Sequence, residues 1–194
     1  YDRLVLAAER HPNPVALLVV LLGGEAGLRV GEMLGLRWSD VDFRAGVVHI
    51  ARSISCDVLD TPKSGEARSV PMPDRLRDAL RAHRKVGDCP VITNPRGELA
   101  RKYVVEDRLY DCQEAAGLPR KGPHILRHTY GSHLAMAGVP QIAIQGLMGH
   151  SDIRMTARYM HLAPAVAMDA AKALNRPSNW RHGGATPAPV QETL

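Results

Sequence analysis

The segment VALLVVLLGGEAG, residues 15–27, decides how the rest of the chain is arranged. Its first eight residues are all apolar, so a helix built from them has no polar face to turn toward water. Asn13 followed by Pro14 is typical of a helix start, and the glycines from residue 23 onward favour a helix end. Eight apolar residues are too few to span a bilayer. The segment therefore predicts a buried helix around which the other elements pack.

Further helical segments flank this central helix on both sides. Apolar residues recur in them at helical spacing, and proline or glycine residues separate them. We expect helices over residues 1–10, 29–36, 73–86, 101–116, 124–137, 140–148, 152–160 and 164–174. Residues 39–71 differ, because they are rich in strand-forming residues around the turn-forming sequence TPKSGE. They predict a small antiparallel sheet of about three strands. The expected fold class is therefore mainly α with a small antiparallel β-sheet (α+β).

The composition limits the kinds of partner. A net charge of +5 and an isoelectric point near 9.4 allow a polyanionic partner without requiring one. Aromatic residues make up only 4% of the chain, too few for a protein that stacks single-stranded bases on aromatic side chains. A nucleic-acid partner would therefore be held through its phosphates. The three cysteines are far apart and form no CxxC pair, so we expect free thiols in a reducing, cytoplasmic compartment.

The segment HILRHTYGSHL begins at His124 and carries three histidines and an arginine. On a helix, His124, Arg127 and His128 lie on one face, and Gly131 continues that face as a position for close packing. Two histidines at this spacing could hold a metal ion, but the arginine between them would repel a cation. The glutamate of an HExxH motif and a third ligand are also missing, so the segment predicts no metal site. We expect His128 and His133 to make structural hydrogen bonds, whereas His124 and Arg127 form a candidate anion site.

Four other segments carry residues that could act on the same anion. GLRVGEMLGLRWSDVD contains Arg29, with Glu32 one helical turn on, and TPKSGEARSVPM contains Lys63 at a turn. LMGH ends at His150, and TARYMH contains Tyr159, nine residues later. Each of these residues alone has an ordinary explanation. An arginine at a helix start or a lysine in a turn usually faces water, and a late tyrosine usually packs in the core.

In this order, the five segments resemble the tyrosine recombinase (phage integrase) family over about residues 26–161. The resemblance implies that family's catalytic fold and its activity, the site-specific cleavage and rejoining of DNA through a 3′-phosphotyrosyl intermediate. It also implies double-stranded DNA as the partner, and neither a cofactor nor a metal ion. The catalytic residues that it implies are Arg29, Lys63, His124, Arg127, His150 and Tyr159.

On this resemblance, the cationic residues bind the scissile phosphate. Arg29 and Arg127 are similar to the family's clamps on the non-bridging oxygens, and His150 is similar to a further hydrogen-bond donor. Glu32 matches an acidic position that we expect to support the site structurally. Physical chemistry supports this role for the two arginines, because an anionic phosphodiester repels an anionic nucleophile. A guanidinium neutralises that charge with a planar fork of donors that stays protonated.

Three other residues resemble the groups that form and break the bonds. Tyr159 is similar to the family's nucleophile, Lys63 to the general acid for the leaving 5′ oxygen, and His124 to a histidine that assists proton transfer. A phenol has an ordinary pKa of about 10, and nearby cations favour its ionised form. A phosphotyrosine stores the broken bond, so rejoining needs no ATP.

The resemblance also predicts how the chain is organised. We expect residues 1–175 to form the catalytic domain and residues 176–194, which are rich in proline and glycine, to form a flexible tail. We expect the family's upstream core-binding domain to be absent from this chain. We expect a monomer that assembles as a homotetramer on DNA and does not associate with membranes. Whether residues 164–174 dock on a neighbouring subunit or on their own domain stays open.

Two alternative functions are weighed against the recombinase. A type IB topoisomerase shares the fold and much of the catalytic set, but that family typically has lysine at the position of His124. A non-catalytic DNA-binding accessory module would not need every catalytic position to be filled. The sequence therefore favours the recombinase over both.

Overall fold

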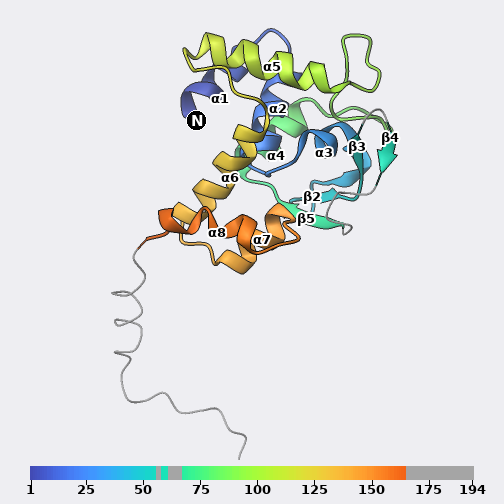
Figure 1. Ribbon diagram of the computed structural model, residues 1–194. Coiled ribbons are helices and arrows are strands. Elements are labelled where there is room, and N and C mark those ends of the chain that lie inside the picture. Colours follow the sequence, from blue (N-terminus) through green and yellow to red (C-terminus); the bar gives the residue numbers. More distant parts are fainter. Residues whose placement is uncertain (56–57, 61–66, 165–194) are drawn as a thin grey trace, which may run out of the picture. The chain divides into compact units, whose positions relative to one another are not determined.

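The structure, a computed structural model, describes residues 1–55, 58–60 and 67–164 (Figure 1). The α-helices are α1 (Asp2–Glu9), α2 (Val15–Gly24), α3 (Val30–Gly35), α4 (Asp74–Ala82), α5 (Lys102–Ala115), α6 (His124–Met136), α7 (Gln141–Met148) and α8 (Arg154–Ala157). Two 3-10 helices are η1 (Trp38–Asp40) and η2 (Met160–Leu162). The strands are β1 (Val41–Asp42), β2 (Val47–Ile50), β3 (Ser53–Ser55), β4 (Val58–Asp60) and β5 (Arg68–Pro71). The described part is mainly helical with small antiparallel sheets, which confirms the predicted fold class.

Helix α2 lies at the centre of the described part. Eight of its ten residues are buried, and it packs against α1, α4, α5 and α6. Figure 1 shows α5 crossing over α1 and α2. A helix that is apolar on all sides must be covered on all sides, so the sequence of α2 determines that other helices surround it. The prediction of a buried central helix is confirmed.

Two small antiparallel sheets lie near α3 (Figure 1). Strands β1, β2 and β5 form one sheet in that order, with the buried Val48 opposite the buried Val70. Strands β3 and β4 form a separate pair. The sequence predicts one sheet of about three strands. The structure differs because β3 packs on α3, which takes the β3–β4 pair away from the first sheet before the chain returns as β5 beside β2.

Helix α6 joins this core to the last helices of the described part. It packs on α2 along one side and contacts α7 and η2 further on, while α7 reaches back to β5 (Figure 1). Strand β5 and the end of α7 are thereby neighbours, although 76 residues separate Pro71 from Leu147 in the sequence. This contact brings the charged side chain of Arg68 in β5 to the carbonyl end of α7.

The predicted helix over residues 152–160 is wrong in its extent, because the structure divides it into α8 and η2. The side chain of Asp152 accepts a hydrogen bond of 2.8 Å from the backbone N–H of Arg154, which holds a turn before α8. The N–H of Tyr159 donates to the carbonyl of Thr156, three residues back, and such bonds tighten the end of a helix. Tyr159 therefore lies between the two short helices. The predicted helix over residues 164–174, apart from its first residue, and the tail over residues 176–194 lie outside the described residues.

Candidate active site

A hollow of about 110 Å³ lies where α3, α6 and the chain beyond α7 meet. Its lining residues are Arg29, His124, Arg127, His128, His150, Met155, Arg158 and Tyr159. All of them except Met155 are polar, and none of them is acidic. The hollow therefore presents positive charge and hydrogen-bond donors to whatever enters it.

Glu32 holds two arginines beside this hollow. Its buried carboxylate accepts two hydrogen bonds from the guanidinium of Arg68, at 2.9 and 2.8 Å. It accepts two more from Arg29, one from Nη1 and one from the backbone N–H, both at 2.9 Å. Burial by itself would raise the pKa of Glu32, but the hydrogen bonds and charges of Arg68 and Arg29 outweigh burial, so the pKa lies below its usual value. Glu32 is therefore ionised and fixes both guanidinium groups, which agrees with the expected supporting role.

Three consecutive carbonyls at the end of α7 also accept hydrogen bonds from arginines. The pairs are Arg68 with Leu147 at 3.0 Å, Arg127 with Met148, and Arg29 with Gly149 at 3.0 Å. The last carbonyls of a helix have no partner within the helix and carry partial negative charge, so they suit a cluster of guanidinium groups. Gly149 has a left-handed backbone (φ 60°), and a Cβ atom there would lie 2.9 Å from Nη1 of Arg68. Glycine thus permits both the turn and the approach of the arginine.

Arg127 is buried although it is charged. Its guanidinium donates to the carbonyls of Gly27 and Met148. Burial and, after it, repulsion by Arg29 lower the pKa of Arg127 to about 9, which leaves it protonated at neutral pH. Because both acceptors are neutral carbonyls, the charge of Arg127 is left for an anion that enters the hollow.

His150 is held by Thr156. Nδ1 of His150 lies 2.9 Å from Oγ1 of Thr156, and both residues are buried. Because a buried hydroxyl needs an acceptor for its proton, we assign the hydroxyl as the donor to Nδ1, which places the ring proton on Nε2. Burial, followed by the charges of Arg127 and Arg29, lowers the pKa of His150 to about 4. His150 is therefore neutral at neutral pH and offers one ring N–H.

Tyr159 packs closely on α6. A Cβ atom at Gly131 would lie 2.9 Å from two atoms of the tyrosine ring, so the expected close packing at Gly131 is confirmed. The phenol oxygen of Tyr159 lies 2.8 Å from Nδ1 of His128. Burial raises the pKa of Tyr159, although the charges of Arg127 and Arg158 act against that change. The phenol is therefore protonated at neutral pH and within hydrogen-bonding distance of a histidine.

This fold and this set of residues correspond to a known family. The sequence profile described as the phage integrase family matches residues 1–165. The chain belongs to the phage integrase family. The family that the five sequence segments predict is thereby confirmed.

Individual integrase relatives agree with this assignment. A tyrosine recombinase XerC-like protein of Caldanaerobacter subterraneus subsp. tengcongensis is 31% identical over 189 residues, covering 80% of this chain and 48% of that protein. The solved catalytic domain of bacteriophage HP1 integrase is 28% identical with a TM-score of 0.64, covering 93% of this chain and 94% of that one. The Tn1549 transposon integrase in complex with circular intermediate DNA is 26% identical with a TM-score of 0.68, covering 89% and 64%. The chain spans about half the length of the curated relatives that it matches.

Most of the predicted site residues meet in the hollow of this integrase fold. Those that line it are Arg29, His124, Arg127, His150 and Tyr159. Arg29 directly precedes α3, His124 and Arg127 lie on the first turns of α6, and His150 follows α7. Lys63, the sixth predicted residue, lies outside the described residues.

Two residues of the site, Arg68 and Thr156, are not among those that the sequence predicts. The signal for Arg68 is strand alternation, because it shares a face of β5 with Val70, which is fully buried. An arginine on the buried face of a strand needs a carboxylate partner. Thr156 gives no comparable signal, because its contact with His150 depends on the turn that precedes α8.

The two histidines that are expected to make structural hydrogen bonds differ from each other in the structure. His128 is half-buried, lines the hollow and approaches Tyr159. His133 is exposed, and its ring meets the ring of Tyr1 edge-on with centroids 5.5 Å apart. The prediction of a core hydrogen bond therefore does not describe the exposed His133, whereas His128 makes a hydrogen-bonding contact, with Tyr159 as its partner.

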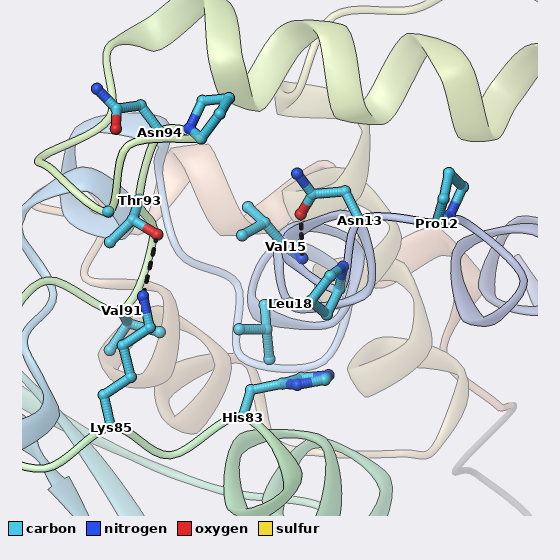
Figure 2. Close-up of a pocket in the computed structure, with 12 residues that line it drawn as sticks. Pro12, Asn13, Val15, Leu18, His83, Lys85, Val91, Thr93 and Asn94 are labelled. Carbon is cyan, nitrogen blue, oxygen red and sulfur yellow. Dashed lines mark hydrogen bonds between the residues drawn. The ribbon is translucent and has the colours of Figure 1, made fainter.

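A larger hollow, of about 380 Å³, lies between the start of α2 and residues 91–97 (Figure 2). On one side of it, Lys85 Nζ donates to Oγ1 of Thr93 at 3.4 Å. On the other side, the side chain of Asn13 accepts a hydrogen bond of 2.9 Å from the N–H of Val15 at the start of α2. Figure 2 shows two separate hydrogen bonds, one between Lys85 and Thr93 and one between Asn13 and Val15. Because these polar groups are already paired, we assign them a role in holding the local backbone and not a role in catalysis.

The described part of the chain carries neither a metal cluster nor a membrane helix. In residues 1–164, apart from the two gaps, no three His, Cys, Asp or Glu side chains come together as a metal site requires. No helix within the same residues is long and apolar enough to cross a membrane. Cys89 and Cys112 are free thiols. Burial raises the pKa of Cys112 to about 11, so its thiol stays protonated and unreactive.

Proposed function

We propose that this chain acts as the catalytic part of a site-specific DNA recombinase, or integrase, that cleaves and rejoins DNA through a 3′-phosphotyrosyl intermediate. The observation that carries the proposal is the single hollow that Tyr159 shares with Arg29, Arg127 and His150. A tyrosine beside guanidinium groups and a histidine suits attack on a phosphodiester. The family of the chain and the recombinases among its relatives support the same activity.

In the proposed reaction, the scissile phosphate occupies the hollow. Arg29 and Arg127 bind its non-bridging oxygens, and His150 donates a further hydrogen bond from its ring N–H. These groups are already held by Glu32, Thr156 and the carbonyls at the end of α7, so little reorganisation is needed when charge develops on the phosphate. The anion also reduces the repulsion between the cations that line the hollow.

In the same reaction, the phenol oxygen of Tyr159 attacks phosphorus and the bond from phosphorus to the 5′ oxygen breaks. Lys63 protonates the leaving 5′ oxygen, and His124 assists proton transfer near the nucleophile. Rejoining reverses these steps, with the 5′-hydroxyl as the attacking group. Because the phosphotyrosine stores the broken bond and cationic side chains supply the positive charge, the proposed reaction uses neither ATP nor a metal ion.

The proposal includes how the chain is organised and what it binds. Residues 1–175 form the catalytic domain, residues 176–194 form a tail, and double-stranded DNA is the partner. The complex of the Tn1549 integrase with circular intermediate DNA supports DNA as the partner. We further propose a protein that acts in the cytoplasm, is monomeric without DNA and forms a homotetramer on it. Sizing by light scattering with and without DNA tests the last two statements.

A covalent-capture experiment tests the activity. The full chain is incubated with a pool of nicked duplexes whose sequence around the nick is randomised, so that no target site needs to be known. Cleavage near the nick releases a short DNA fragment that carries the 5′-hydroxyl. Because this fragment diffuses away, rejoining cannot occur and the protein stays covalently attached to the DNA. We expect a denaturation-resistant adduct, with the DNA attached to Tyr159 by peptide mapping, and none with Tyr159→Phe.

The outcomes separate the proposal from the two alternatives. Absence of any adduct with the wild-type chain would falsify the enzymatic reading and leave a DNA-binding module. An adduct that still forms with the Tyr159→Phe variant would show that Tyr159 is not the nucleophile. Relaxation of supercoiled plasmid regardless of sequence would indicate a topoisomerase instead.

A further inference from the structure

His128 lines the hollow beside Tyr159 but has no role in the reaction proposed above. Its Nδ1 atom is 2.8 Å from the phenol oxygen of Tyr159, and their ring centroids are 6.0 Å apart. Both side chains line the 110 Å³ hollow. His128 directly follows Arg127 on α6, and Tyr159 packs on Gly131 one turn further along the same helix. The contact between histidine and phenol is thus built on a regular helix.

The phenol of Tyr159 must lose its proton as it attacks phosphorus. An ordinary phenol, with a pKa of about 10, is ionised in only about one molecule in a thousand at pH 7. Burial raises the pKa of Tyr159 further, so a proton acceptor at the phenol oxygen is needed. The acceptor has to lie within hydrogen-bonding reach of that oxygen.

The other described groups near the hollow are less suited to this step. Arg29 and Arg127 are cationic side chains, and the carboxylate of Glu32 is fully engaged by Arg29 and Arg68. His124 lines the same hollow, but within the described residues its ring makes no hydrogen bond with the phenol. Nδ1 of His150 is engaged by Thr156. Among the described residues, the side chain within hydrogen-bonding distance of the phenol oxygen is that of His128.

We propose that His128 is a further catalytic residue, which takes the proton of the Tyr159 phenol at Nδ1 during cleavage and returns it during rejoining. This inference rests on the proposed function, because it assumes that Tyr159 is the nucleophile. As the bond from the phenol oxygen to phosphorus forms, the O–H bond breaks and its proton moves to Nδ1. The bond from phosphorus to the 5′ oxygen breaks, and that oxygen takes a proton from Lys63. In rejoining, the imidazolium of His128 protonates the departing phenol oxygen.

The surroundings of His128 keep it ready to accept a proton. Burial, followed by the charges of Arg158, His124 and Arg127, lowers the pKa of His128 below its usual value. From the segment between α8 and η2, Tyr159 faces the ring, and its phenol oxygen lies within hydrogen-bonding distance of Nδ1. His128 is therefore neutral at neutral pH, and the phenol is the donor in the pair when the ring proton lies on Nε2.

The test measures single-turnover cleavage of the duplex that the wild-type chain captures most often from the randomised pool. His128→Ala removes the acceptor, whereas His128→Asn keeps a side chain that can accept a hydrogen bond but cannot take up a proton. We expect both variants to form the Tyr159 adduct on the order of a hundredfold more slowly at pH 7. His133→Asn, an exposed histidine of the same helix, is the matched control, and its rate is expected to equal that of the wild type.

The pH profile separates proton transfer from simple positioning. The wild-type rate is expected to be level above the lowered pKa of His128 and to fall below it, where the ring is already protonated. The rates of both variants are expected to keep rising with pH, because hydroxide must then remove the phenol proton. Imidazole added at pH 7 is expected to speed His128→Ala and not His128→Asn. Thermal melting and DNA affinity serve as checks that the variants fold and bind.

Three results overturn the inference. If His128→Asn restores the wild-type rate and profile, the residue only positions the phenol. If both variants cleave at nearly the wild-type rate while Tyr159→Phe stays inactive, the inference fails and the proposed function stands. If the wild-type chain forms no adduct with any member of the pool, the proposed function fails and the inference fails with it.

Discussion

The two sides of the hollow are held in different ways. The arginine side consists of Arg29, Arg68 and Arg127, which Glu32 and the last carbonyls of α7 fix through many hydrogen bonds. The tyrosine side consists of His124, His128, Arg158 and Tyr159, and one hydrogen-bonding contact joins its two central members. Its tyrosine lies between helices of four and three residues.

The difference matches the work each side has to do in the proposed reaction. Like charges stay together only when carboxylates or helix ends hold them, so the side that binds the anion has to be rigid before the anion arrives. A nucleophile has to approach phosphorus and retreat, and a segment between two short helices, held by few hydrogen bonds, permits that movement. The comparison predicts large effects from changes on the arginine side and smaller effects from changes in packing on the tyrosine side.

The largest expected effect is that of Arg127→Ala on cleavage. An arginine that stabilises a phosphoryl-transfer transition state contributes on the order of a thousandfold or more, so adduct formation is expected to slow by that factor. DNA affinity, measured by fluorescence anisotropy, is expected to fall far less. Arg158→Ala is the control, because Arg158 lines the same hollow but is exposed. Equal losses of cleavage and binding for Arg127→Ala would show that it is only a DNA contact.

A second test concerns what holds the arginine side. Glu32→Gln leaves Arg68 with a buried and unpaired charge, and breaking a buried ion pair costs about 3–5 kcal/mol of unfolding free energy. The matched control is Glu106→Gln, which breaks an exposed pair with Lys102 and is expected to cost about 0.5 kcal/mol. Urea denaturation monitored by circular dichroism measures both. Similar costs for the two variants would mean that the arginine side is not built around Glu32.

The burial of His150, together with the nearby charges of the arginine side, also predicts how stability depends on pH. The pKa of His150 falls from 6.5 to about 4 in the folded chain, so between these values the unfolded chain binds the proton and the folded chain does not. The free energy of unfolding is therefore expected to decrease as the pH is lowered through this window. His150→Gln is expected to weaken that decrease, and His133→Gln, an exposed histidine, is not. Urea titrations at several pH values give the slopes, and identical slopes for the two variants would contradict the assignment.

The smallest expected effect concerns the packing of the tyrosine. Gly131→Ala pushes a methyl group against Tyr159 and the sulfur of Met148, and such overpacking costs about 1–3 kcal/mol. Gly146→Ala in α7 meets nothing within 4 Å and is expected to stabilise the chain by up to about 1 kcal/mol. Thermal melting compares the two variants. Stabilisation by both would show that the tyrosine ring moves aside easily and that the tyrosine side is even looser than described.

The sequence predicts the fold well where local pattern and packing agree. The apolar run of α2 requires burial on all sides, and the other helices follow from periodicity and their end signals. The prediction fails at residues 152–160, where one side-chain turn at Asp152 and one tightened backbone turn at Tyr159 shorten the helix. It also fails to separate β3 and β4 from the first sheet, because that depends on packing against α3.

By itself, the sequence determines the central helix, the family and the residues of the hollow that were assigned from it, since these follow from residue types and their order. Only the tertiary structure decides the partners of those residues. Arg68 meets Glu32 across 36 residues, and His128 meets Tyr159 across 31. Helical periodicity relates only residues of the same helix, such as His124 and Arg127, and it cannot relate a strand to a helix. The approach of β5 to α3 makes the first pair, and the approach of the segment between α8 and η2 to α6 makes the second. These approaches create a rigid site for an anion and an acceptor for the phenol proton.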